Sequence, residues 1–148
     1  MWALLEFWYI CVKRLVMIEL GIKGRQDTTV TSANVATNVG SGTVQVFATP
    51  MMIMLMEKAA ALSIEPFLGD GQSSVGTHVD VLHSSATPLG MKVWAESEVI
   101  AVDRRKVTFA VKAFDEKGLI GEGIHERFII DVEKFVAKAE GKTAAAVG

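Results

Sequence analysis

Residues 49–62 read TPMMIMLMEKAAAL, an apolar run that opens with a threonine and a proline. Proline is favoured at the first helical position and threonine at the cap before it, so we predict a helix that begins at Thr49. The helix should end before Pro66, because a proline pushes the residue in front of it out of helical geometry. A helix that is apolar on all sides is a buried helix, so this segment is expected to form the centre of the fold.

One carboxylate, that of Glu57, interrupts the apolar run. A buried carboxylate costs several kcal/mol of free energy unless it is paired, protonated or hydrogen-bonded. Glu57 is therefore a candidate functional residue, although a structural salt bridge to a lysine or a hydrogen bond to a neighbouring hydroxyl would explain it equally well. In a straight helix Glu57 lies about 12 Å from Thr49 along the axis and about 80° away around it, so the two side chains cannot touch.

The second half of the chain alternates polar and apolar residues with the period of two that is typical of strands. Short turn segments, such as Asp103-Arg104-Arg105, separate long alternating stretches and predict hairpins. The predicted strands cover residues 24–30, 77–83, 93–102, 106–114 and 119–131. A long buried helix followed by an antiparallel meander predicts an α+β protein in which a curved sheet wraps a long central helix, which is the plan of the hotdog fold.

The length of 148 residues predicts one domain with a single core. We assign residues 17–135 to this domain and expect residues 136–148, rich in alanine, lysine and glycine, to form a frayed tail. Residues 1–16 are interpreted as an apolar N-terminal extension, helical if ordered. They lack the charged start and cleavage site of a secretory signal, and they are short for a membrane span and contain Glu6. Met17 also fits a domain start, in which case the extension would be an artefact of the assigned translation start.

Charge and composition exclude several classes of partner. The formal net charge is -2 and the lysines and arginines are scattered, so the chain has no electrostatic footprint for nucleic acid. Cys11 is the single cysteine, which excludes an intramolecular disulfide framework and a cysteine-rich zinc site. His78 and His83 face opposite sides of their predicted strand and His125 is remote in the sequence, so no metal site is expected. We therefore expect a cytoplasmic protein without nucleic-acid, membrane or metal partners.

Four segments of the chain resemble, in the same order, the fluoroacetyl-CoA thioesterase-like branch of the hotdog-fold acyl-CoA thioesterase superfamily. They are residues 46–57, 75–77, 83–90 and 125–127, and the resemblance spans about residues 20–135. It implies a hydrolase that cleaves acyl-CoA thioesters, is usually a homodimer, and needs no cofactor besides the coenzyme A of its substrate.

The resemblance also implies roles for five residues of this chain. By their positions in the matching segments, Thr49, Glu57 and His83 would be catalytic, Gly76 would lie by the thioester, and Arg127 would help to hold the substrate.

Taken singly, each candidate residue also has a plain structural explanation. Thr49 could simply cap the helix, His83 could be a structural hydrogen-bonding residue at a strand end, and Arg127 could pair with a surface acid.

Taken together, the candidate residues fit thioester hydrolysis. His83 can act as a base for the threonine hydroxyl or for water, and Glu57 can orient the imidazole or position the water. Helix amides beside Thr49, or the backbone of Gly76, would stabilise the oxyanion. Whether Thr49 attacks covalently or orients water does not follow from the sequence.

The separation of Thr49 and Glu57 along the helix bears on whether the site needs a second subunit. Because Thr49 and Glu57 cannot touch within one helix, either His83 and the substrate lie between them or one of the three residues comes from a partner subunit. We favour the dimeric site. The alternative function, on the same fold, is a protein that binds an acyl-CoA or a small ligand without catalysis.

Substrate selectivity is a separate question. The specialised fluoroacetyl-CoA enzyme carries a bulky aromatic residue in a lid ahead of the helix, where this chain has Gly40-Ser41-Gly42-Thr43. Selectivity for fluoroacetyl-CoA is therefore not expected to transfer.

Overall fold

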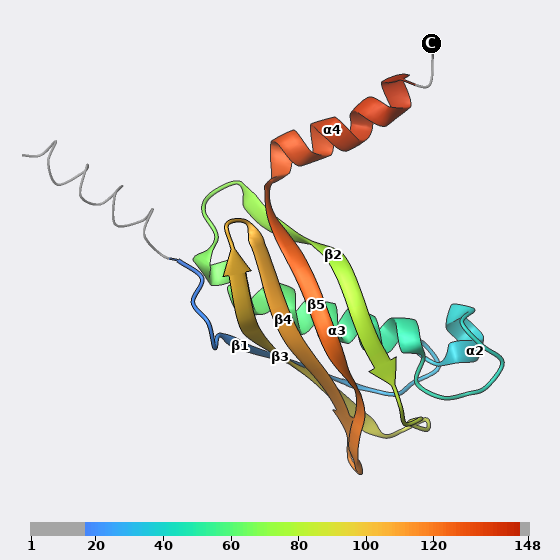
Figure 1. The fold of residues 1–148 in the computed structure, drawn as a ribbon. Coiled ribbons are helices and arrows are strands. Elements are labelled where there is room, and N and C mark those ends of the chain that lie inside the picture. The colour runs from blue at the N-terminus through green and yellow to red at the C-terminus, as the bar shows by residue number, and fades with distance from the viewer. Residues whose placement is uncertain (1–16, 146–148) are drawn as a thin grey trace, which may run out of the picture.

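The structure, a computed structural model, describes residues 17–145 (Figure 1). The predicted extension over residues 1–16, with Cys11, lies outside the described residues. The elements follow in the order β1 (Lys23–Thr29), α2 (Ala36–Val39), α3 (Thr49–Ile64), the 3-10 turn η1 (Glu65–Phe67), β2 (Gln72–His83), β3 (Lys92–Asp103), β4 (Lys106–Asp115), β5 (Gly118–Asp131) and α4 (Val132–Ala145).

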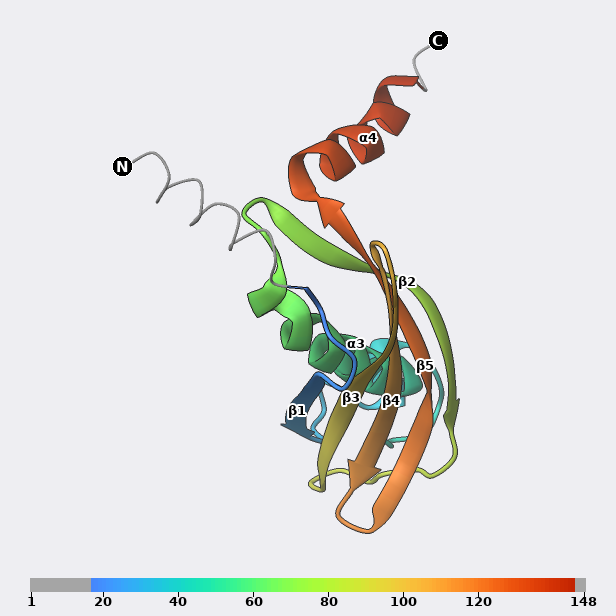
Figure 2. The same ribbon diagram turned by 60° about the vertical axis from the view of Figure 1, so that its left-hand side comes forward.

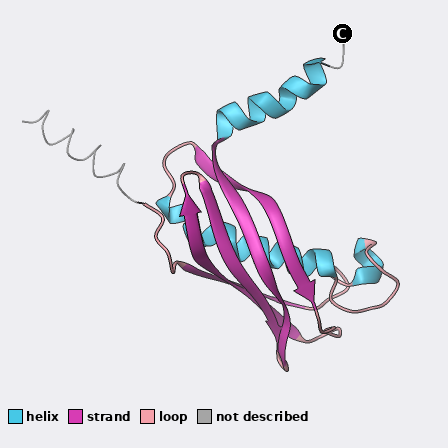
Figure 3. Cartoon of the chain, in the orientation of Figure 1, coloured by secondary structure: helices cyan, strands magenta, loops and turns pink. Residues whose placement is uncertain are grey.

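The five strands form one antiparallel sheet in the order β1-β3-β4-β5-β2. Two tight hairpins join β3 to β4 and β4 to β5, and each uses a residue with positive φ, Arg104 at 57° and Gly118 at 140°. The sheet curves, and α3 lies across its concave face (Figures 1 and 2). The predicted α+β hotdog architecture is confirmed, with one long helix held against a curved antiparallel sheet (Figure 3).

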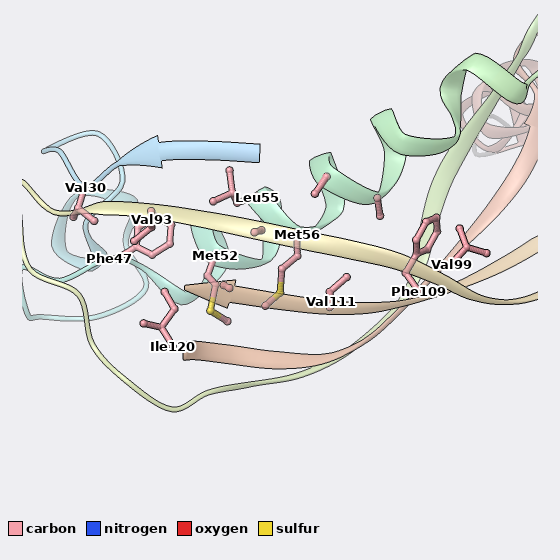
Figure 4. Packing of buried hydrophobic residues seen from close by; sticks show 14 of the residues in the cluster. Val30, Phe47, Met52, Leu55, Met56, Val93, Val99, Phe109, Val111 and Ile120 are labelled. Carbon is pink, nitrogen blue, oxygen red and sulfur yellow. The ribbon is translucent and has the colours of Figure 1, made fainter. Parts of the chain in front are cut away.

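The core fills the layer between α3 and the sheet. Met52 and Met56 point from the helix toward the strands and are almost fully buried (Figure 4). The helix lies so close to β1 that a Cβ on Gly24 would collide with the carbonyl oxygen of Ala59, so only glycine fits there. Buried residues from the strands and loops complete the cluster, among them Val30, Phe47, Val93, Val99, Phe109, Val111 and Ile120.

The prediction that α3 is buried on all sides is wrong for one face. Met54 is 47% exposed and Leu62 is 43% exposed, because the sheet of a single chain covers only one side of the helix. The predicted start of the helix at Thr49 and its end before Pro66 are confirmed. One apolar face of the helix therefore has no cover from the described part of its own chain.

Two further boundaries differ from the prediction. Strand β2 begins at Gln72, before the predicted start at Thr77. Residues 136–145, predicted as part of a frayed tail, continue α4 and project away from the sheet (Figure 1). Among residues 17–145, no helix combines the length and the apolar character that a membrane crossing requires.

Candidate active site

The first residue of α3 meets the last residue of β2. Thr49 Oγ1 lies 2.7 Å from His83 Nδ1, within hydrogen-bond distance. The prediction that Thr49 caps the helix is wrong, since the N-cap position belongs to Ala48 and the threonine hydroxyl is engaged by the histidine. Proline still explains the helix start, because Pro50 sits in the first turn. The hydroxyl and the imidazole thus form a dyad at the N-terminal, positive end of the helix dipole.

The imidazole of His83 is held in its neutral form. Burial lowers its pKa from the usual 6.5, and the backbone of Ser85 opposes this shift. Its Nε2 atom is buried and has no hydrogen-bond partner among the described residues. A neutral imidazole beside a hydroxyl can accept a proton, so the dyad has the components of a nucleophile and its base.

The second cluster is centred on Arg127 of β5, whose side chain is only 9% exposed. Its Nε donates to Ser74 Oγ and its Nη2 donates to the Ser74 carbonyl oxygen, each at 2.8 Å. Its Nη1 lies 3.4 Å from Glu57 Oε2, while the Glu57 side chain remains 39% exposed. Burial lowers the pKa of Arg127 and the negative charge of Glu57 opposes this. Arg127 is therefore a buried cation that faces the helix, in contrast to the surface ion pair that the sequence also allowed.

A histidine outside the predicted site set belongs to the same cluster. His125 is 1% exposed, its Nδ1 lies 2.8 Å from the carbonyl oxygen of His78, and its Nε2 lies 3.3 Å from Arg127 Nη1. Burial lowers its pKa, the His78 carbonyl opposes the shift and the Arg127 charge adds to it. The alternation of β5 placed His125 and Arg127 on one face, which was the available sequence signal. Ser74 had no such signal.

Gly76 lies on β2 opposite Arg127 and against the carboxylate of Glu57. A Cβ at this position would lie 2.5 Å from Glu57 Oε2 and 3.2 Å from His125 Cε1, so any larger residue would displace the carboxylate. The pairing of β2 with β5 shifts register between Gly76 and His78, which leaves Thr77 outside the regular ladder. Such bulges often occur next to active sites.

The five predicted site residues thus fall into two groups within one chain. Thr49 and His83 contact each other, whereas Glu57, Gly76 and Arg127 lie together at the middle of the helix. Within the described residues, no hydrogen bond or ion pair joins Glu57 to the dyad. This agrees with the prediction that one helix keeps Thr49 and Glu57 apart. In the same part of the chain, no three acidic, histidine or cysteine side chains are placed to hold a metal ion.

Comparisons with known proteins cover both groups of residues. The family model for fluoroacetyl-CoA-specific thioesterases matches residues 30–133. A fluoroacetyl-CoA thioesterase from Streptantibioticus cattleyicolor is 43% identical over 101 residues, which are 68% of this chain and 73% of that protein.

Solved structures are also similar to this chain. A fluoroacetyl-CoA thioesterase superposes with a TM-score of 0.81 and 33% identity, covering 85% of this chain and 98% of the other. A hypothetical protein of Thermus thermophilus, described as a thioesterase superfamily member, superposes with a TM-score of 0.81 and 29% identity, covering 87% and 96%. The similarity therefore extends over nearly the whole of these two solved chains.

Proposed function

This chain belongs to the fluoroacetyl-CoA-specific thioesterase family and is an acyl-CoA thioesterase, and on that premise we propose that Thr49, His83 and Glu57 carry out the hydrolysis. The observation that carries the proposal is the 2.7 Å contact between Thr49 Oγ1 and His83 Nδ1. A hydroxyl within hydrogen-bond distance of a neutral imidazole is the arrangement of an activated oxygen nucleophile. The family membership favours catalysis over simple binding of an acyl-CoA.

The proposed reaction has two steps. His83 Nδ1 accepts the hydroxyl proton of Thr49 while Oγ1 forms a bond to the thioester carbonyl carbon. The carbon–sulfur bond breaks, and the CoA sulfur leaves with the proton that His83 held. Water then gives a proton to His83 and attacks the threonine ester. The acid is released and the proton returns to Thr49.

The surroundings of the dyad support the negative charge that develops on the carbonyl oxygen. The dyad lies at the N-terminus of the 16-residue helix α3, where the helix dipole favours an anion. We assign to Gly76, at the bulge of β2, a place beside the thioester, because it packs directly against the carboxylate of Glu57. Arg127 is assigned to substrate binding through its charge, with Ser74 holding its guanidinium in place.

We assign Glu57 to the dyad of a partner subunit in a homodimer. Within the described residues, no hydrogen bond joins Glu57 to Thr49 or His83 of its own chain. The Glu57 side chain is 39% exposed, so its carboxylate is open to a second copy.

The surface of the chain supports such a dimer. Strand β2 lies at one end of the sheet, and its exposed residues include Val79 and Leu82, the latter 73% exposed. The apolar residues Met54 and Leu62 of α3 are also open. Long open strand edges and apolar helix faces are rarely left uncovered in monomers. A two-fold pairing of two copies would cover both surfaces.

We propose acyl-CoA thioesters as substrates and coenzyme A as a component of the substrate, with no separate cofactor. The exposed segment from Gly40 to Thr43 lacks an aromatic side chain, so selectivity for fluoroacetyl-CoA is not transferred to this chain. A cytoplasmic location is proposed from the single cysteine, which suits a reducing compartment. Nucleic acid and membranes are not proposed as partners.

The function is tested by measuring release of CoA from a panel of acyl-CoA thioesters of increasing chain length, including fluoroacetyl-CoA. The chain should be assayed from Met1 and from Met17, so that any effect of the extension is seen. Thr49→Val should lower kcat by at least about a hundredfold, because it removes the nucleophilic hydroxyl. Thr29→Val, at an exposed position of β1, is the matched control. Binding of acyl-CoA without turnover by the unaltered protein would instead support the non-catalytic function.

A further inference from the structure

His125 is a buried titratable residue that the proposed reaction does not use. Its Nδ1 lies 2.8 Å from the carbonyl oxygen of His78, and a carbonyl oxygen can only accept a hydrogen bond. Nδ1 therefore carries the proton. In the neutral ring the lone pair then lies on Nε2, which is 3.3 Å from Arg127 Nη1. A guanidinium can only donate, so His125 accepts a hydrogen bond from Arg127.

The acceptors around the guanidinium of Arg127 show which part of it His125 holds. Nε and Nη2 donate to the hydroxyl and the carbonyl oxygen of Ser74. Nη1 has two protons and two acceptors, His125 Nε2 at 3.3 Å and Glu57 Oε2 at 3.4 Å. Ser74 thus fixes one side of the planar guanidinium, and His125 fixes the direction of the nitrogen that faces Glu57.

The surroundings of His125 keep its ring neutral, the form that can accept a hydrogen bond from Arg127. A protonated ring would place a positive charge and an N–H against Arg127, and it would leave the guanidinium without this acceptor. Burial and the charge of Arg127 lower the pKa of His125, whereas the His78 carbonyl and the carboxylates of Glu57 and Glu126 oppose this. The net shift is downward, so the ring is neutral near pH 7.

We propose that His125 is a positioning residue that, through Arg127, holds the carboxylate of Glu57 in its reactive place. This inference rests on the proposed role of Glu57 in hydrolysis. His125 is almost completely buried and contacts Arg127, so it acts through this neighbour and not on the substrate directly. Its ring also packs near Phe109, with ring centroids 6.2 Å apart, and a packing role alone would make a different prediction for the variants below.

Two substitutions separate the two hydrogen bonds of His125. The amide of asparagine reaches the position of Nδ1 and can keep the bond to the His78 carbonyl, but it falls short of Arg127. The amide of glutamine reaches the position of Nε2 and can keep an acceptor for Arg127. For each variant, kcat and KM are measured with the best acyl-CoA of the panel, and the free energy of unfolding is measured in urea.

The positioning role predicts that His125→Asn lowers kcat by at least about tenfold, which corresponds to about 1.4 kcal/mol, with KM nearly unchanged. His125→Gln should keep kcat within about threefold of the unaltered protein, because the acceptor is restored. The proposal is overturned if His125→Asn keeps full turnover, or if both variants lose kcat in proportion to their loss of unfolding free energy.

Failure of the underlying function would be seen separately. If the unaltered protein released no CoA, or if Glu57→Gln retained full turnover, the proposed chemistry would fail whatever the His125 variants did. Glu122→Gln, at an exposed position of β5, is the matched control for Glu57→Gln. A case in which Glu57→Gln is inactive and His125→Asn is fully active would reject the positioning role alone.

Discussion

Thr49, the first residue of helix α3, has its hydroxyl within hydrogen-bond distance of His83, the last residue of strand β2. Helix capping is the ordinary use of a threonine at such a site, and Ala48 occupies the cap position here without a side-chain hydrogen bond. Thr49 is therefore free to contact His83, and the pair forms where the end of β2 reaches the start of α3. Through this contact the imidazole can take the proton of the hydroxyl, which makes the threonine oxygen a nucleophile.

At Gly76, the missing side chain is itself a structural requirement. We predict that Gly76→Ala lowers kcat by about tenfold or more, because the added Cβ would displace the Glu57 carboxylate that lies 2.5 Å from its position. Steady-state assays of CoA release check this. Gly141→Ala is the matched control, since a Cβ there has open space. Equal activity of the two variants would mean that turnover does not depend on the position of the Glu57 carboxylate.

Several site residues were predictable from the sequence, and others were not. Glu57 stood out because a carboxylate in an apolar helix is costly, and Arg127 and His83 were found through their matching segments. Ser74 and His125 become part of the site only through strand register, since Arg127 reaches Ser74 across the β2–β5 pair. Pairing register across 53 residues of sequence separation is not contained in local patterns.

At the scale of elements, α3 and the sheet are held at close range by small residues. Gly24 faces the backbone of α3 at Ala59 and the side chains of Ser63 and Ser97. The helix can approach β1 because no Cβ intervenes. This approach sets the depth at which the helix, and with it Thr49 and Glu57, lies against the strands.

We predict that Gly24→Ala lowers the free energy of unfolding by about 1–3 kcal/mol, the usual cost of overpacking a tight contact. Urea denaturation followed by circular dichroism measures the change. Gly42→Ala is the control, because a Cβ there would meet Ala36 only at 3.4 Å, an ordinary contact distance. A loss equally small for both variants would show that the helix can move away from β1 at little cost.

Element boundaries were predictable where a strong local signal was present. Pro50 and Pro66 bracket α3, and both helix ends agree with the structure. The first part of β2, Gln72 to Gly76, lacks strict alternation and was missed, because its pairing with β5 is what makes it a strand. The composition of residues 136–145 predicts a frayed tail, but their alanines and lysines also have high helix propensity, and they continue α4.

At the scale of the whole molecule, the buried His125 and the half-buried His83 couple stability to pH. Because the pKa values of His83 and His125 are lowered on folding, the unfolded chain binds protons more readily below about pH 6.5. Their contribution to stability is thus fully present above that pH and is lost as the pH falls. We predict a lower free energy of unfolding at pH 5.5 than at pH 7.5.

Urea titrations at both pH values check this prediction. His125→Gln, which removes one of the two titrating groups, should show a smaller difference between them. A difference that is the same in the variant and the unaltered protein would assign the pH dependence to other groups.

The central claim is that the site is composite, with the Thr49–His83 dyad of one subunit and Glu57 of the other. Subunit complementation tests it most directly. Thr49→Val and Glu57→Gln are purified separately, mixed in equal amounts under conditions that exchange subunits, and assayed for CoA release. Differently tagged chains confirm that mixed dimers form.

Each mixed dimer would contain one site with both substitutions and one site with neither. The account therefore predicts that two inactive proteins regain about a quarter of the unaltered activity, since half of the dimers are mixed and half of their sites are intact. If mixed dimers form and the activity stays at the level of the two parents, Thr49 and Glu57 act within one subunit and the composite site is contradicted.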